Sequence, residues 1–330
     1  MTSLIKLAGF VAVLAVALGV SFGVGNAVGP VTNDQGPSHS GGHEMDRDQG
    51  HGSAQHEQPD QQGHPPGGLM VSQDGYTLQL DETELASGTR TVKFRIIDPD
   101  GDAVSRYVPN HEKDLHLIAV RRDSTGFQHL HPTLDQSGTW SAPVDLSAGT
   151  WRFFTDMQPE GTDEAMTLGA DAHVAGDFTP QPVPADDRTA TVDDYSVTLD
   201  GELVPGKARD LSLRVTRVGK PVTDLDPYLG AYGHLVALRS GDLAYLHVHP
   251  DGAPGDGATE PGPEVTFTTT APSAGTYRLF LDFQHEGEVR TAEFTVTTST
   301  PADGASAPPS PSPSGSAPTS SSHQPRPLSA

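Results

Sequence analysis

Two histidine triplets recur in this chain at one spacing that suits metal chemistry. They share the pattern His-x12-His-x-His and are His116, His129 and His131 in the first copy, and His234, His247 and His249 in the second copy. Neutral imidazole is a ligand for zinc and copper ions. Cysteine ligands are excluded, because the chain contains no cysteine. The spacing therefore predicts a histidine metal site in each copy.

Two short strands must position each triplet. Residues two apart in a strand share a face, so His129 and His131 are expected to point the same way. A hairpin between strands at 115–121 and 127–131 places His116 close to opposite that pair. Cross-strand neighbours lie about 4.5–5.5 Å apart at Cβ, and three imidazoles at that spacing can share one ion.

A packing role for these histidines is the alternative. His116 shares its strand face with Ile118 and Val120, and His129 shares its face with Phe127, so backbone carbonyls at the edge of a core are plausible partners. A single histidine in such a place is more often structural. Three that converge without a ligand repel each other when charged or leave ring nitrogens unpaired, which favours metal binding.

The repeat extends well beyond the histidines and predicts the fold. Residues 147–156 match 273–282, and residues 115–121 match 233–239. Short segments that alternate with period two are separated by turn residues, and no segment has the pattern of a long amphipathic helix. The segments with strand character are 76–80, 91–96, 115–121, 127–131, 139–146, 150–157 and 170–178, then 195–199, 211–215 and 291–297. This pattern predicts an all-β fold of two tandem immunoglobulin-like β-sandwich domains.

Composition divides the rest of the chain. The expected parts are a signal peptide or N-terminal membrane anchor at 1–29, a disordered His-rich linker at 30–69, sandwich repeat 1 at 70–179, a linker at 180–190, sandwich repeat 2 at 191–298 and a disordered Pro/Ser-rich tail at 299–330. Lys6 precedes the uncharged run 7–24, which predicts export. We expect a protein outside the cytoplasm, secreted or anchored, that touches the membrane only through its N-terminal segment.

The charge balance limits the partners. The net charge is −23, which argues against nucleic acid and anionic membrane surfaces and favours local accumulation of cations. The linker carries His39, His43, His51, His56 and His64. These five either capture metal ions loosely or act as polar spacer residues, and the sequence leaves both open.

Additional ligands are harder to place. Asp156 and Asp282 occupy equivalent positions, but alternation puts Asp156 on the face of Arg152, so we expect each aspartate to pair with an arginine at the surface. Asp171 and His173 share a face on the last strand of the first copy. In the second copy only His285 could take their place, so the first copy is expected to hold the more complete site.

A resemblance to known families rests on two motifs. Gly126-Phe127-Gln128-His129-Leu130-His131-Pro132 and Leu168-Gly169-Ala170-Asp171-Ala172-His173-Val174-Ala175-Gly176 resemble exported actinobacterial proteins described as heavy-metal-binding. The second motif also looks like the closing strand of CopC-type copper proteins, which are Ig-like sandwiches. That likeness implies copper ligation by Asp171 and His173, although the HxH pair is not part of that family's pattern. YtkA-like envelope domains are similar in fold.

The ligand types point to copper first and zinc second, since histidine and carboxylate suit both and Cu(II) stands highest in the stability order. Met157 and Met166 offer soft ligands for Cu(I) but are more often packing residues. We expect a non-catalytic exported protein that sequesters copper or hands it to another envelope metal-handling protein. Two alternatives stay open. One is an envelope adhesion or structural module with architectural histidines. The other is a three-histidine metalloenzyme, suggested by the cupin-like position of Asp135.

Overall fold

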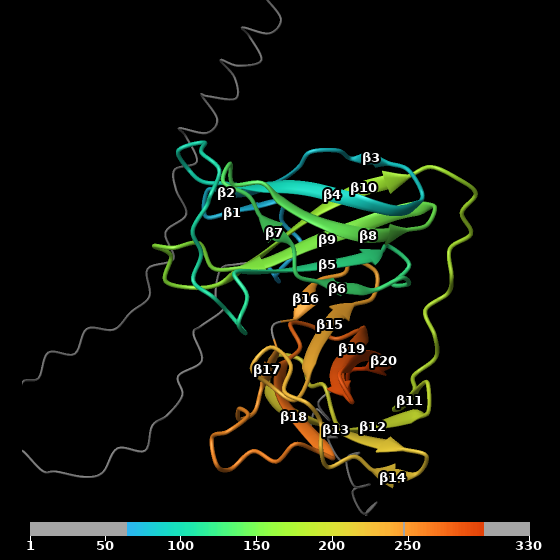
Figure 1. The fold of residues 1–330 in the computed structure, drawn as a ribbon. Helices are drawn as coiled ribbons and strands as arrows, with labels where there is room; N and C mark the ends of the chain where they lie inside the picture. The colour runs from blue at the N-terminus through green and yellow to red at the C-terminus, as the bar shows by residue number, and fades with distance from the viewer. Residues whose placement is uncertain (1–64, 247, 300–330) are drawn as a thin grey trace, which may run out of the picture. The chain divides into compact units, whose positions relative to one another are not determined.

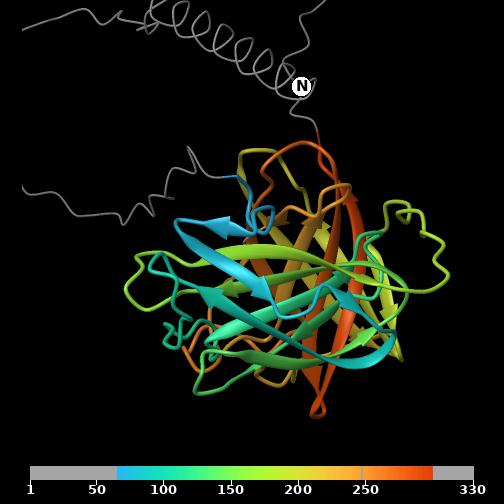
Figure 2. The same cartoon turned by 90° about the horizontal axis from the view of Figure 1, so that it is seen from above.

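A computed structural model describes residues 65–246 and 248–299 (Figures 1 and 2). Within these ranges all regular secondary structure is β-strand. The same ranges contain no helix that is long and apolar enough to cross a membrane. The predicted export segment, most of the His-rich linker and the predicted tail after Ser299 lie outside the described residues.

The first repeat is a β-sandwich of two five-stranded sheets. Their strand orders are β1-β2-β4-β8-β7 and β3-β10-β9-β5-β6 (Figure 1). The strands are β1 (Ser72–Gln73), β2 (Tyr76–Leu80), β3 (Glu84–Leu85), β4 (Gly88–Ile97), β5 (Leu115–Arg121), β6 (Gln128–Leu130), β7 (Thr133–Leu134), β8 (Trp140–Leu146), β9 (Gly149–Met157) and β10 (Met166–Val174).

The second repeat has the same plan. One sheet runs β11-β12-β13-β18-β17 with β14 beside β13, and the other runs β16-β15-β19-β20. The strands are β11 (Thr189–Val192), β12 (Tyr195–Gly201), β13 (Ala208–Arg217), β14 (Lys220–Pro221), β15 (His234–Arg239), β16 (Tyr245–Leu246), β17 (Val248–Pro250), β18 (Glu264–Thr270), β19 (Thr276–His285) and β20 (Glu288–Thr297). The predicted all-β fold of two tandem sandwiches is confirmed.

Alternation explains how each sandwich forms its core. In β8 the buried positions are Trp140, Ala142, Val144 and Leu146, and the residues between them face outward. These side chains join Phe94, Trp151 and Phe153 in the first core, and an equivalent cluster around Tyr195, Phe267 and Phe294 fills the second. Burying each large apolar side chain contributes roughly 1.5–3 kcal/mol, which holds the two sheets together.

Strand β5 is buried on both faces, and its second face determines where the histidines lie. Leu115, Leu117 and Ala119 belong to the first core. The other face contributes to a third apolar cluster, made of Ile118, Val120, Phe154, Val236, Leu238, Leu243 and Phe280. Since Val236, Leu238, Leu243 and Phe280 come from the second repeat, this cluster joins the repeats. The face that His116 shares with Ile118 and Val120 therefore packs on the second repeat, and not at the edge of the first core.

The first histidine pair lies close to where the chain leaves one sheet for the other. In the first repeat β6 pairs with β5, whereas β7, which follows after His131 and Pro132, pairs with β8 of the opposite sheet. Proline has no N–H to donate to a ladder, so it suits the crossing point. The second repeat also changes sheets here, but earlier: β16 pairs with β15, and β17, which already contains His249, pairs with β18 of the opposite sheet. The longer Gly/Pro-rich stretch 251–263 is a loop between β17 and β18, as predicted.

The segment just before β1 belongs to the folded part. Gly67 bridges to Tyr245 of the second repeat, and the Gly68 N–H donates to the Thr167 carbonyl at 2.8 Å. The Arg152 guanidinium donates to the carbonyls of Gly68 and Leu69. Residues 67–69 thus contact both repeats, which corrects the prediction that a disordered linker continues to residue 69.

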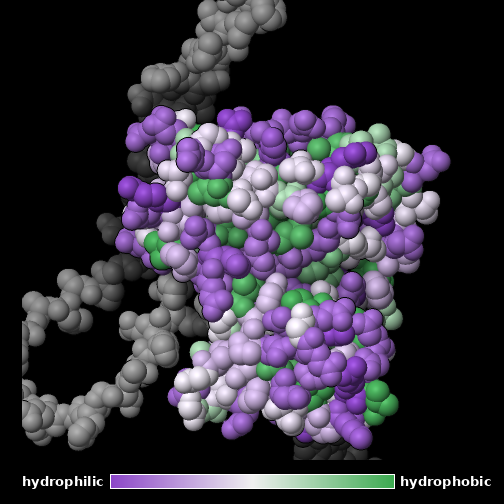
Figure 3. Space-filling view, in the orientation of Figure 1, coloured by the Kyte–Doolittle hydropathy of each residue, from purple (hydrophilic) through white to green (hydrophobic). Residues whose placement is uncertain are grey.

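The surface is mainly hydrophilic on the face drawn in Figure 3, with apolar residues scattered singly. The large apolar side chains that are exposed in the described part of the chain are Met70, Val71, Val108, Phe178, Val183, Val218 and Val289. Isolated exposed apolar residues are normal on a soluble domain and mark no docking site.

Candidate metal centre

His116, His129 and His131 converge, as their spacing predicts. Strand β5 carries His116. The antiparallel register between β5 and β6 pairs Ile118 with His129 and Leu117 with Leu130. The next pair in this register is His116 with His131. One ring nitrogen from each of the three histidines lies within 4.8 Å of the other two. The ring centroids are 5.2 Å apart for His116 and His129, 5.2 Å for His116 and His131, and 5.1 Å for His129 and His131.

Hydrogen bonds fix the orientation of two of these rings. His116 Nε2 lies 3.0 Å from the Asn110 carbonyl oxygen. A carbonyl only accepts, so this nitrogen carries the proton. His129 Nδ1 lies 2.7 Å from Asp282 Oδ2. The carboxylate also only accepts hydrogen bonds, so Nδ1 carries the proton of His129. The remaining nitrogens, His116 Nδ1 and His129 Nε2, then face each other at 3.0 Å as two lone pairs.

Facing lone pairs repel each other, and a cation between them would remove that repulsion. Protonation of His116 is opposed, because burial and then repulsion from His129 lower the pKa of His116 to about 4. A metal ion satisfies both nitrogens without a proton. Two bonds of about 2.0–2.1 Å at angles of about 90–109° place the nitrogens roughly 2.8–3.4 Å apart, which includes the observed separation.

His131 provides the third nitrogen. Its Nε2 atom is buried and has no hydrogen-bond partner among the described residues. Burial, followed by repulsion from His129 and His116, lowers the pKa of His131 to about 3, so its ring is neutral at pH 7. A buried nitrogen without a partner costs about 1–3 kcal/mol, and bonding to an ion removes that cost.

The second repeat contributes to the same place. A cavity of about 40 Å³ is lined by Asn110, His111, His116, His129, Asp156, His234, Leu235, Val236, Tyr245, Val248 and Pro250. The rings of His111 and His234 are 5.0 Å apart. His234 Nε2 lies 2.9 Å from the Tyr228 carbonyl, just as His116 does from Asn110, and burial lowers the pKa of His234 to about 4. His234 therefore lines the same cavity as His116 and His129, and its ring centroid lies 6.3 Å from that of His129.

The two repeated aspartates contradict the sequence prediction. Asp156 and Asp282 are both buried, and neither pairs with an arginine of the described residues. In register Asp156 lies across from His116 and Asp282 across from His234. Asp156 accepts hydrogen bonds from the hydroxyls of Thr167 and Tyr245 at 3.4 Å each. Alternation assigned their face correctly, but that face covers the other repeat and not solvent.

Asp171 and His173 are not brought to this cluster. Asp171 forms ion pairs with Arg122 at 2.6 Å and Arg152 at 3.0 Å. Along β10 it lies four residues beyond Thr167, the partner of Asp156, which is about 13 Å at 3.3 Å per residue. His173 is exposed, with Nδ1 3.1 Å from the Thr150 hydroxyl. The structure thus places the copper ligands implied by the CopC-type resemblance away from the triplet.

His285 also lies apart from the triplets. It is buried, with Nδ1 2.7 Å from the Tyr195 hydroxyl and Nε2 3.2 Å from Asp224 Oδ1. This is a separate polar contact at the end of β19. His247 lies outside the described residues, and of His249 only the backbone, in β17, is described. Met157 and Met166 are buried in the first core, where they pack.

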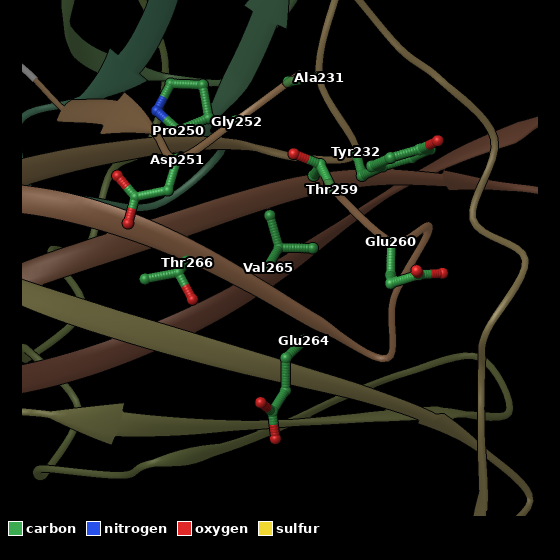
Figure 4. Close-up of a pocket in the computed structure, with 10 residues that line it drawn as sticks. All are labelled: Ala231, Tyr232, Pro250, Asp251, Gly252, Thr259, Glu260, Glu264, Val265 and Thr266. Atoms are coloured by element: carbon green, nitrogen blue, oxygen red, sulfur yellow. The ribbon is translucent and has the colours of Figure 1, made fainter. Parts of the chain in front are cut away.

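A larger cavity, of about 250 Å³, lies in the second repeat (Figure 4). Its lining includes the carboxylates of Asp251, Glu260 and Glu264, together with Tyr232 and Thr266. All three acidic residues are exposed. Acidic side chains gathered at the surface of a chain of net charge −23 need no ligand to explain them, and we assign none.

Asn110, Tyr228 and Asp282 take part in the site, and none of them was predicted from the sequence to do so. Asn110 and Tyr228 act through backbone carbonyls, which leave no signal in residue type. Asp282 did leave a signal, since the aspartate recurs at equivalent positions in both copies. The repeat could not identify His129 as the partner of Asp282, because the two residues are 153 positions apart in the sequence.

Solved structures similar to this chain score low. A mutant of Salmonella alpha-2-macroglobulin is 14% identical with a TM-score of 0.24 and covers 71% of this chain. Escherichia coli alpha-2-macroglobulin activated by porcine elastase is 16% identical with a TM-score of 0.21 and covers 68% of this chain. The chain spans only 15% and 20% of those two proteins. Domains 4 and 5 of the S-layer protein SbsC are 9% identical with a TM-score of 0.19, and the match covers 69% of this chain and 98% of that protein. Scores this low support no argument about function.

No curated protein matches this chain. One family model does match, over residues 71–174 and again over residues 190–300, so each sandwich corresponds to one copy of the model. These two ranges make up well over half of the chain. The chain therefore belongs to the family described as a domain of unknown function, DUF8832, and contains two consecutive copies of that domain.

Proposed function

We propose that this protein binds a transition-metal ion through His116, His129 and His131. The observation that carries the proposal is the pair of facing nitrogens, His116 Nδ1 and His129 Nε2, 3.0 Å apart, each with its proton held on the other side of the ring. The unpartnered Nε2 of His131 supports it.

Ligand chemistry favours Cu(II) first and Zn(II) second. Three imidazole nitrogens suit both ions, and Cu(II) forms the more stable complexes. Three protein ligands leave a coordination position open, and an open position allows an ion to be passed on. We therefore propose sequestration or handover of copper outside the cytoplasm, with another envelope metal-handling protein as the receiving partner.

An architectural role for the histidines is the competing function. It requires every ring to be satisfied by protein atoms. His116 and His129 each meet this requirement at one nitrogen, but the buried Nε2 of His131 does not. The same binding experiment decides between the two functions.

The test compares metal affinities of full-length variants. The double variant His129→Ala/His131→Ala should bind Cu(II) at least about 100-fold more weakly than the wild type in a chelator competition, because loss of one outer partner alone typically costs 10–100-fold. His173→Ala is the matched control, since His173 is exposed and lies away from the triplet. The His-rich linker is present in every variant, so any metal binding by the linker affects all variants equally.

Two outcomes would contradict the proposal. One is equal Cu(II) affinity in the wild type and the double variant, and the other is an equal loss in the His173→Ala control. Electron paramagnetic resonance of the copper-loaded wild type should show coupling to several nitrogens, and that coupling should disappear in the double variant.

A further inference from the structure

Asp282 is a buried carboxylate of the second repeat that reaches into the first. It lies on β19, and its side chain is only 4% exposed. Oδ2 accepts a hydrogen bond from His129 Nδ1–H at 2.7 Å, and Oδ1 accepts one from the Thr291 hydroxyl at 2.6 Å. Both oxygens are therefore held, which leaves the carboxylate little freedom to turn.

Asp156 is the equivalent residue of the first repeat and behaves differently. It lies across from His116 in register, as Asp282 lies across from His234. Its partners include the hydroxyls of Thr167 and Tyr245, both at 3.4 Å, whereas Asp282 bonds to His129. Of the two aspartates, only Asp282 is bonded to the described triplet.

The bond to Asp282 has a chemical consequence for His129. A carboxylate that accepts Nδ1–H fixes the tautomer, points Nε2 the opposite way and makes that nitrogen more basic. In this protein Nε2 is the atom that faces His116 Nδ1. Without the carboxylate, the buried ring is free to carry its proton on Nε2 and lose the lone pair that an ion needs.

We propose that Asp282 is the positioning residue for His129, so that the metal site is built by both repeats together and not by the first repeat alone. This inference rests on the proposed function. It follows that ion binding and the contact between the repeats strengthen each other, because each favours the same orientation of His129.

The test replaces Asp282 by Asn in the full chain, with Asp224→Asn as the matched control, because the Asp224 carboxylate also pairs with a histidine, His285, that lies apart from the triplet. The Asp282→Asn variant should bind Cu(II) about 10–100-fold more weakly, whereas Asp224→Asn should stay within about twofold. In the metal-free wild type, nitrogen chemical shifts should show His129 protonated at Nδ1, and that preference should be lost in Asp282→Asn. A merely structural aspartate would not control the tautomer.

A milder variant covers the case in which Asp282→Asn does not fold. Thr291→Val removes the hydroxyl that holds Asp282 Oδ1, and it should weaken Cu(II) binding in the same direction by a smaller factor. Unchanged affinity in the folded variants, in a wild type that binds copper, overturns the positioning role. A wild type that binds no copper overturns the proposed function, whereas an Nε2-protonated His129 in the metal-free wild type overturns this inference separately.

Discussion

At the scale of single residues, the centre is defined by which nitrogen of each ring is already engaged. Asn110 holds His116 and Asp282 holds His129, while His131 Nε2 is left without a partner. Burial opposes protonation of the rings, since the pKa values of His116 and His131 fall to about 4 and about 3. The rings of His116 and His131 are thus neutral at pH 7, which is the form that the proposed metal site needs.

These pKa values predict an acid-dependent loss of stability in the metal-free protein. A histidine in the unfolded chain has a pKa near 6.5. Below that pH the unfolded chain therefore binds protons that His116 and His131 do not bind in the folded protein. The stabilisation from neutral His116 and His131 is fully present above pH 6.5. It declines as the pH falls through about 4 for His116 and about 3 for His131.

Urea unfolding between pH 7 and pH 4 measures this effect. The free energy of unfolding should decrease over that range in the metal-free wild type, and the decrease should be smaller in His131→Gln, which cannot take up the proton. An equal decrease in both proteins would show that His131 does not contribute.

At the scale of elements, the centre depends on the outward face of β5 and its packing against β15 and β19. Phe127 and Phe280 stack with ring centroids 4.0 Å apart and an interplanar angle of 4°. Phe280 is fully buried in the cluster that joins the repeats. It lies two residues before Asp282 on the same face of β19, so the apolar contact also determines where that carboxylate lies.

Replacing Phe280 by Ala should lower the free energy of unfolding by about 3–5 kcal/mol, because it leaves a cavity in a closely packed contact. Chemical denaturation of the metal-free protein measures the change. Val218, which is 78% exposed, gives the control, and Val218→Ala should change stability by no more than about 0.5 kcal/mol. A Phe280→Ala cost as small as that of the control would argue against this cluster as the contact that joins the repeats.

At the scale of the whole molecule, the proposed site couples ion binding to the stability of both repeats. A ligand that binds only the folded state stabilises it by RT ln(1 + [L]/Kd), which is about 2.7 kcal/mol at one hundred times Kd. Cu(II) at that concentration should therefore raise the midpoint of thermal unfolding of the full chain.

Differential scanning calorimetry with and without Cu(II) tests the coupling. The upward shift should be large in the wild type and in His173→Ala, and much smaller in Asp282→Asn at the same free copper concentration, because that variant has the higher Kd. A shift that is the same in all three proteins would place the binding outside the histidine triplet.

The sequence by itself determined what depends on local pattern. Period-two alternation and the internal repeat predicted two sandwiches, and the spacing from His116 to His129 and His131 predicted their convergence, because a hairpin register is set over a few residues. Two predictions from the sequence were wrong. Asp171 was predicted to be a metal ligand, but it pairs with Arg122 and Arg152. Asp282 was predicted to pair with an arginine, but it bonds to His129.

Only the tertiary structure decided what the second face of β5 touches. Alternation separates the two faces of a strand but does not identify the partner of either face. The partner is the second repeat, which brings Asp282 to His129 across 153 residues and His234 into the same cavity. That contact arises from packing between two sheets. Such packing depends on the shape and burial of whole sheet faces, and these cannot be predicted from the spacing of residues within one strand.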